Sequence, residues 1–155
     1  MKICFLASGK GGNFKFLNLA KKLGIISNVD LFLIADRDCD SLEYAKKNKI
    51  FNKKIHYKKS DNTEFLKELE IIDPDIIITN WHKIIDVEVV NKYQGKLINL
   101  HYSLLPAFDG LIGIEPIKQA YDRSCSYIGA TCHYVDEGVD SGGIISQSII
   151  KADIL

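Results

Sequence analysis

The sequence predicts an α/β fold with an open, mostly parallel twisted sheet and a β edge near the C-terminus, on three observations. Short apolar runs alternate with amphipathic segments through the first two-thirds of the 155 residues, as in βαβ units. The run from Pro74 to Thr79 is almost continuously apolar, which is typical of a strand covered on both faces. Two strand-like runs around the acidic turn at 136–142 indicate an antiparallel hairpin at the sheet edge. We expect one domain over residues 1–155.

The individual elements follow from periodicity and from the residues that start and stop helices. Ser41 is a candidate N-cap for the second helix, Thr63 or Asn62 for the third, and Pro116 suits a helix start. The spacing of Phe14, Leu17 and Leu23 indicates the apolar face of the first helix. The strands are expected at 2–7, 29–36, 54–57, 74–79, 96–100, 127–135 and 142–150. The helices are expected at 13–24, 41–50, 62–71, 86–93 and 115–122.

Composition narrows the class of partner. Twenty basic and twenty acidic side chains cancel, which argues against a broad electrostatic surface for nucleic acid or an anionic membrane. We therefore expect small-molecule substrates, with the chain as a monomer or homodimer. The apolar run at the N-terminus is too short for a signal peptide or a membrane span, so we expect a cytoplasmic protein. The four cysteines lack CxxC spacing, so we expect free thiols and no metal site.

A glycine-rich loop, SGKGGN, directly follows the first predicted strand. Ligands of open α/β sheets bind beyond the carboxyl ends of the strands, and a helix start offers N–H groups and a positive dipole end. The loop lacks both the GxGxxG pattern and the ending of a Walker loop. Two interpretations stay open: a tight strand–helix turn without a ligand, or a small phosphate pocket in which Asn13 is an extra donor.

Asn99, His101 and Ser103 alternate with apolar residues at the end of a later predicted strand, so all three are expected on one face. An imidazole can take or give a proton near neutral pH. Asn99 can donate to a carbonyl oxygen that becomes negative in a tetrahedral intermediate, and Asp140 can orient or charge-stabilise the histidine. The remaining histidines are interpreted as an edge residue (His56), a pocket-lining residue (His82) and a structural strand residue (His133).

Two stretches carry a family resemblance: INLHYSLLPAFDG at 98–110 and IGATCHYVDEGVDSGGIISQ at 128–147. Together with the glycine loop, they resemble the folate-dependent formyltransferases over nearly the whole chain. The resemblance implies the formyltransferase fold with a Rossmann-like N-terminal half, and 10-formyltetrahydrofolate as the formyl donor without a metal. It also implies that Asn99, His101 and Asp140 are the catalytic residues.

The same resemblance distributes the binding roles. It places Ser8, Lys10, Gly11, Gly12 and Asn13 on the substrate side. It assigns Trp81, His82, Lys83, Ile84, Ile85, Asp136 and Glu137 to the pterin pocket for the folate. In the implied reaction, a neutral amine attacks the formyl carbonyl while Asn99 and protonated His101 stabilise the oxyanion. Asp140 would hold the histidine charged and manage the proton of the amine.

Three functions stay open at this point. The first is formylation of phosphoribosylglycinamide in purine biosynthesis. The second has similar chemistry, either formylation of another amine, such as a nucleotide-linked amino sugar, or hydrolysis of formyltetrahydrofolate. The third is a catalytically silent folate- or nucleotide-binding module. The sequence TNWHKII replaces the usual pterin-loop sequence of the family, and we expect the domain to lack the family's C-terminal strand and helix.

The stretch SLLPAFDG must leave a buried strand and bend sharply. A cis bond between Leu105 and Pro106 would make that bend in one step. Only about 5–6% of X–Pro bonds in folded proteins are cis, which favours trans. A catalytic setting raises the expectation of cis above that frequency, because surrounding packing can hold a rare backbone state beside a site.

Overall fold

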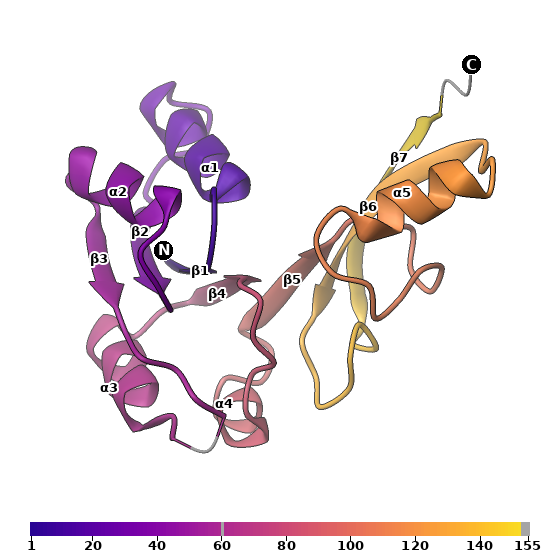
Figure 1. Cartoon of the computed structure of the whole chain (residues 1–155). Helices are drawn as coiled ribbons and strands as arrows, with labels where there is room; N and C mark the ends of the chain where they lie inside the picture. The colour runs from indigo at the N-terminus through magenta and orange to yellow at the C-terminus, as the bar shows by residue number, and fades with distance from the viewer. Residues whose placement is uncertain (60, 153–155) are drawn as a thin grey trace. The chain divides into compact units, whose positions relative to one another are not determined.

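In the computed structural model, which describes residues 1–59 and 61–152, the chain forms two compact units, Met1–Val89 and Val90–Leu155. Figure 1 labels their helices and strands. Strands alternate with helices in the first unit, whereas antiparallel strands dominate the second. The α/β class is thereby confirmed, and the expectation of a single domain stays a prediction.

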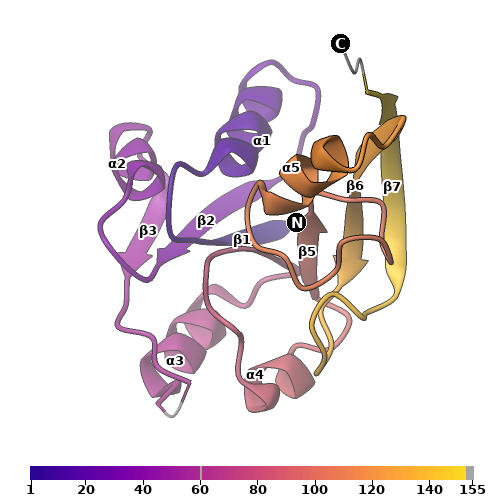
Figure 2. The same cartoon turned by 45° about the vertical axis from the view of Figure 1, so that its right-hand side comes forward.

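The first unit is built on four parallel strands in the spatial order β3-β2-β1-β4. This is the order of strands in half of a Rossmann-like sheet. Figures 1 and 2 show α1 and α2 on one face of these strands and α3 on the other. The strands are β1 (Lys2–Ala7), β2 (Asp30–Ala35), β3 (Phe51–Lys54) and β4 (Ile76–Asn80). The helices are α1 (Gly12–Lys22), α2 (Asp40–Lys47) and α3 (Thr63–Ile72).

The core of the first unit includes a cluster between its strands and the α1–α2 face. Phe14 of α1 and Leu42 of α2 are buried against alternate residues of β1 and β2. The period of two along a strand explains why every second residue belongs to this cluster. The strand residues are Ile3, Phe5, Ala7, Leu31, Leu33 and Ala35. The packed strands hold the loops that follow β1 and β4 at the carboxyl ends of neighbouring parallel strands.

The second unit contains three antiparallel strands in the order β5-β6-β7, which Figure 2 shows side by side. The β6–β7 pair confirms the predicted hairpin, with a bulge opposite Cys132 and His133. The elements are β5 (Leu97–His101), α5 (Glu115–Asp122), β6 (Tyr127–Tyr134) and β7 (Ile144–Lys151). A short helix, α4 (Val87–Lys92), spans the boundary of the two units in sequence.

Three details of the predicted elements are wrong. The third strand is Phe51–Lys54, not 54–57, because its ladder with β2 ends where the N–H of Ile55 bonds to the carbonyl of Ala35. Ser41 is not an N-cap, because its hydroxyl donates to the Gly9 carbonyl at 2.9 Å and Cys39 takes the cap position. Leu23 lies after the end of α1 and is exposed. The other elements are found with ends within three residues of those predicted.

The four cysteines are free, as expected. Burial raises the pKa of the Cys4 and Cys132 thiols, so neither is poised as a thiolate. Within the described residues, every helix is too short or too polar to cross a bilayer. The expected cytoplasmic location and oligomeric state stay predictions.

Candidate active site

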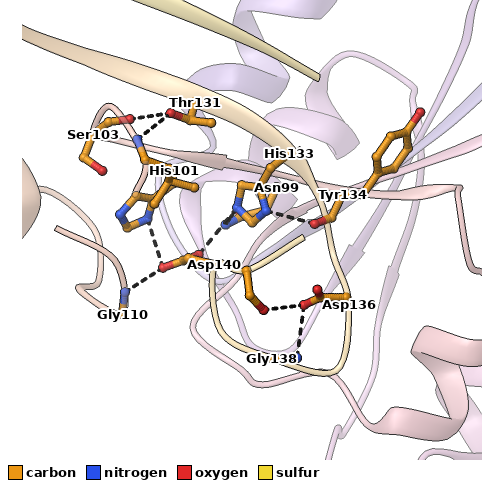
Figure 3. Close-up of polar contacts among 12 residues, drawn as sticks. Asn99, His101, Ser103, Gly110, Thr131, His133, Tyr134, Asp136, Gly138 and Asp140 are labelled. Carbon is orange, nitrogen blue, oxygen red and sulfur yellow. Dashed lines mark hydrogen bonds and ion pairs between the residues drawn. The ribbon is translucent and has the colours of Figure 1, made fainter. Parts of the chain in front are cut away.

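Polar side chains from β5 and β6 gather on one face of the second unit. The antiparallel register places Asn99 opposite His133 and His101 opposite Thr131. Because residues directly opposite each other share a face of a sheet, this register brings two polar residues of each strand together. His101 and His133 are 5% and 2% exposed. Figure 3 shows them converging on the carboxylate of Asp140.

The ring of His101 has an oxygen acceptor at each nitrogen. Nε2 lies 2.9 Å from the carbonyl oxygen of Phe108, and Nδ1 lies 3.4 Å from Oδ2 of Asp140. A carbonyl oxygen only accepts, so Nε2 carries a hydrogen. Nδ1 can then donate to the carboxylate only if it is protonated as well. The imidazolium satisfies both contacts, whereas a neutral ring satisfies one.

Asp140 places one carboxylate between two imidazoles. Its Oδ2 also accepts the backbone N–H of Gly110 at 2.9 Å, and its Oδ1 lies 3.5 Å from Nε2 of His133. The residue has a φ of 53°, a left-handed conformation that aspartate tolerates better than most residues. The side chain is nearly buried.

The turn between β6 and β7 is shaped by its own side chains. Oδ1 of Asp136 accepts the N–H of Gly138 at 3.0 Å and the hydroxyl of Ser141 at 2.7 Å. A Cβ on Gly142 would lie 1.8 Å from the carbonyl oxygen of Tyr134, so only glycine fits there. These contacts hold the backbone from which the aspartate of the site projects.

Ser103 does not join Asn99 and His101 as the alternation predicts. β5 ends at His101, and the hydroxyl of Ser103 donates to the carbonyl of Ala107 inside the following loop. The alternation fails because the period of two holds only while the chain remains extended. Ser103 stabilises the loop, and it is not a side chain of the candidate site.

The loop after β5 is fixed by one hydroxyl of β6. Thr131 Oγ1 donates to the carbonyl of Ser103 at 2.7 Å and accepts the N–H of Leu105 at 3.0 Å. The Leu105–Pro106 bond is cis, although the general frequency of X–Pro bonds favoured trans. The loop continues to Phe108, whose carbonyl contacts His101.

His133 joins this network, which the sequence alone did not predict. It was interpreted as structural, but its Nε2 lies 3.3 Å from Nδ2 of Asn99 as well as beside Asp140. Its Nδ1 lies 2.9 Å from the carbonyl oxygen of Tyr134. The strand period shows only that His133 and Thr131 share a face. The pairing register with β5 was needed to place His133 opposite Asn99.

The glycine loop lies in the first unit, between β1 and α1. Gly11 precedes α1 with a φ of 65°, and a Cβ there would lie 2.5 Å from Cβ of Ser41. Glycine is therefore required both by conformation and by space. Asn13 donates through Nδ2 to Oδ1 of Asn80 at 3.0 Å, which ties the start of α1 to the end of β4. Lys10 is exposed beside them.

Ser8 connects three strand ends of the same unit. Its hydroxyl accepts the N–H of His82 at 3.1 Å and bonds to the carboxylate of Asp36. The Asp36 side chain is 1% exposed and pairs with Arg37 at 2.7 Å. Burial by itself raises the pKa of Asp36, but the hydrogen bonds of Arg37 and Ser8 and the charges of Arg37 and Lys83 outweigh it. The net pKa lies below the ordinary value.

The segment from Trp81 to Ile85 follows β4. Trp81 packs against Tyr57 and Phe65, with ring centroids 4.9 and 5.1 Å apart, and Ile85 is buried. Among the described residues, Nε1 of Trp81 is the one buried side-chain polar atom without a hydrogen-bond partner. An open depression of about 790 Å³ lies beside the segment, lined by Tyr57, Lys58, Lys59, His82, Lys83, Ile84 and Asp86.

The structure thus groups the predicted site residues by unit. Asn99, His101 and Asp140 contact one network in the second unit, where Asp136 and Glu137 lie in the adjoining turn. The residues assigned to the substrate loop and those of the segment after β4 lie in the first unit, joined through Ser8. Histidine, cysteine and acidic side chains form no group of three or more suited to a metal ion in the described parts of the chain.

Comparison with known proteins finds one matching family and several proteins of similar sequence. The family described as "Formyl transferase" matches residues 1–154. The chain is 29% identical to the chloroplastic phosphoribosylglycinamide formyltransferase of Arabidopsis thaliana, over 97% of this chain and 55% of that protein. It is 38% identical to the formyltetrahydrofolate deformylase of Bacillus subtilis, over 71% of this chain and 34% of that protein. The chain therefore spans about half or less of these two relatives.

Solved structures agree with the fold. The crystal structure of phosphoribosylglycinamide formyltransferase from Bacillus halodurans superposes with a TM-score of 0.87 at 29% identity. That likeness covers 99% of this chain and 81% of the other. The predicted formyltransferase fold is therefore confirmed.

Proposed function

Since the chain belongs to the formyl transferase family, we propose that it transfers the formyl group of 10-formyltetrahydrofolate to the amine of phosphoribosylglycinamide, a step of purine biosynthesis. The observation that carries the proposal is the paired contact of His101 with Phe108 and Asp140, next to the amide of Asn99. This arrangement brings an imidazole that can carry a second proton and a side-chain amide into one cluster, and both groups can donate to a developing oxyanion.

The chemistry follows from these groups. The lone pair of the neutral amine forms a C–N bond to the formyl carbon, and the carbonyl oxygen takes the negative charge. Asn99 donates to that oxygen, and so does protonated His101 once its Nε2–H turns from the Phe108 carbonyl to the substrate. Asp140 keeps His101 charged and accepts the proton that the attacking amine loses, directly or through water. The intermediate collapses when the bond from the formyl carbon to N10 of the folate breaks and the carbonyl re-forms. N10 takes the proton that the amine lost, which Asp140 returns directly or through water. No side chain needs to form a covalent intermediate.

The binding roles are proposed in the first unit. The loop with Gly11, Gly12 and Asn13 would hold the phosphate of the amine substrate, since glycines let backbone N–H groups approach an anion at a helix start. Ser8 and Lys10 belong to the same loop. The segment Trp81–Ile85 would contact the folate, and the lysines of the adjoining depression suit its carboxylates. Asp136 and Glu137 would contribute from the turn of the second unit.

Hydrolysis of formyltetrahydrofolate is the second candidate, and the likeness to the deformylase of Bacillus subtilis favours it. The two reactions share the same oxyanion and leaving group and differ in the nucleophile, which is water in hydrolysis. The donors at Asn99 and His101 serve either reaction equally. The nucleophile must therefore be identified by experiment.

The test is a panel of amines offered with 10-formyltetrahydrofolate. Phosphoribosylglycinamide, a nucleotide-linked amino sugar and glycinamide without phosphate are each incubated with the full chain, and tetrahydrofolate is measured. We expect release of tetrahydrofolate that depends on phosphoribosylglycinamide and is much slower with the other two. Release at the same rate without any amine would instead support hydrolysis. Binding of the folate without release from any mixture would support a silent module.

A further inference from the structure

The tautomer of His133 is fixed by the backbone. Nδ1 lies 2.9 Å from the carbonyl oxygen of Tyr134, which can only accept, so Nδ1 carries a hydrogen. The ring is 2% exposed, and the Tyr134 carbonyl satisfies the N–H at Nδ1 without a water molecule. In the neutral ring Nε2 therefore has a lone pair and must accept.

The partner that Nε2 finds is the amide of Asn99. Nδ2 of Asn99 lies 3.3 Å from Nε2 of His133, and the two residues face each other across the β5–β6 ladder. A side-chain amide can be turned so that either its oxygen or its nitrogen faces a neighbour. An acceptor at Nε2 selects the nitrogen, and it directs the remaining N–H of the same group away from His133.

Among the ion pairs of the described residues, one carboxylate serves both histidines. His101 and His133 both approach Asp140, at 3.4 and 3.5 Å, so one carboxylate would have to balance two cations if both rings were protonated. Nδ1 of His101 meets Asp140, whereas Nε2 of His133 meets both Asp140 and the amide of Asn99, which can donate to it. One added proton is therefore best placed on His101.

We infer that neutral His133 is a positioning residue that holds the amide of Asn99 so that an N–H of Asn99 is directed at the formyl oxygen. The inference rests on the proposed function for the identity of that oxygen. His133 itself touches no reacting atom. Its effect on the rate passes through Asn99, which distinguishes it from a residue that merely fills the space between two strands.

The test is a double-mutant cycle on formyl transfer, supported by a spectroscopic measurement. His133→Leu removes the acceptor, whereas His133→Gln offers a side-chain oxygen near the position of Nε2. We expect His133→Leu to lower kcat at least about tenfold, with nearly unchanged KM values. The loss should not exceed the roughly 10²–10³-fold that is typical of removing an oxyanion donor. His133→Gln should recover most of this loss. In the Asn99→Ala background, His133→Leu should have little further effect, because the two residues act as one unit.

Thr131→Val is the matched control, because Thr131 lies on the same face of β6 as His133. The hydrogen bonds of its hydroxyl go to Ser103, Leu105 and Gln147, not to Asn99 or Asp140. Its effect should add to that of Asn99→Ala. Additive effects of His133→Leu and Asn99→Ala would overturn the inference, as would failure of His133→Gln to recover activity.

Nitrogen-15 NMR of the histidine side chains decides the same question without turnover or substitution of His133. We expect His133 in the full chain at neutral pH to be neutral with its hydrogen on Nδ1, and a hydrogen on Nε2 or a doubly protonated ring would overturn the inference. If wild-type protein formylates no amine, the proposed function fails while this measurement still establishes or refutes the state of His133.

Discussion

Oδ2 of Asp140 lies 3.4 Å from Nδ1 of His101, and the opposite nitrogen of the same ring is held by a backbone carbonyl. The ring is thus fixed at both ends before any substrate binds. A ring that is already oriented needs only to exchange the Phe108 carbonyl for the substrate oxygen when negative charge develops there, and preorganised donors of this kind are the basis of electrostatic catalysis. The contact between Asp140 and His101 therefore carries the first prediction.

His101→Ala and Asp140→Asn should each lower formyl transfer by at least about 10²-fold, the loss typical of one oxyanion donor, with the fold retained. His101→Ala removes the cation, and Asp140→Asn removes the charge that favours it. Steady-state kinetics with phosphoribosylglycinamide measures the effect, and circular dichroism checks the fold. His56→Ala is the control, because His56 is exposed and should leave the rate unchanged. Wild-type turnover in either site variant would show that the catalytic groups lie elsewhere.

Gly11→Ala should both destabilise the protein and weaken binding of the amine substrate. The left-handed conformation costs an alanine about 1–2 kcal/mol, and the new Cβ would meet Ser41 at 2.5 Å. We expect a lower Tm in thermal unfolding and a KM that rises more for phosphoribosylglycinamide than for the folate. Gly9→Ala is the matched control in the same loop, because a Cβ at Gly9 meets nothing within 4 Å. Equal increases in both KM values would point to general misfolding.

Asp36→Asn should make stability less dependent on acid pH. The pKa of Asp36 is lowered in the folded state, so its ionised form stabilises the fold above the ordinary carboxyl pKa. That stabilisation is lost as the pH falls through the lowered value. Near neutral pH we expect the variant to lose about 1.5–3 kcal/mol, typical of a hydrogen bond to a charged group. Urea unfolding at several pH values below 5 should show a shallower decline than in wild type.

Asp38→Asn is the control for that series, since Asp38 pairs with Lys54 in solvent and contributes little to stability. A decline for Asp36→Asn as steep as that of wild type would mean that Asp36 does not carry the acid dependence.

Trp81 should report folate binding through its fluorescence. It is the single tryptophan of the chain and is 8% exposed, and it directly precedes the residues that line the depression. A bound pterin near His82 and Lys83 should quench or shift its emission in a saturable titration, after correction for absorption with free tryptophan. Lys83→Ala should weaken the titration, whereas Lys151→Ala on β7 should not. Saturable folate binding with unchanged emission would place the pterin away from this segment.

The sequence predicted the elements that depend on local pattern. Continuous apolar runs located the buried strands, and the alternation of Asn99 and His101 placed both on one face because a strand repeats every two residues. Gly11 was predicted as a loop glycine, and the structure requires glycine there for a reason that involves Ser41, which is distant in sequence. Local pattern cannot reveal such a contact.

Tertiary contacts also explain where the local pattern failed or gave no prediction. Serine is a common N-cap residue, but the hydroxyl of Ser41 donates to the carbonyl of Gly9, which is distant in sequence. Ser103 follows the alternation in sequence, but β5 has already ended. His133 was interpreted as a structural strand residue, and its contacts with Asn99 and Asp140 depend on the register between β5 and β6, which is set by tertiary pairing. The cis bond at Leu105–Pro106 is likewise decided by packing around the loop.

The central claim is that the groups around His101 and Asp140 transfer a formyl group to an amine. The most direct measurement follows the carbon itself, with 10-formyltetrahydrofolate labelled with carbon-13 in the formyl group and phosphoribosylglycinamide as acceptor. Carbon-13 NMR distinguishes a formamide from formate. We expect labelled formyl-phosphoribosylglycinamide with wild-type protein and almost none with His101→Ala. Labelled formate as the sole product would contradict the proposed transfer, and equal formamide from His101→Ala would contradict the assigned site.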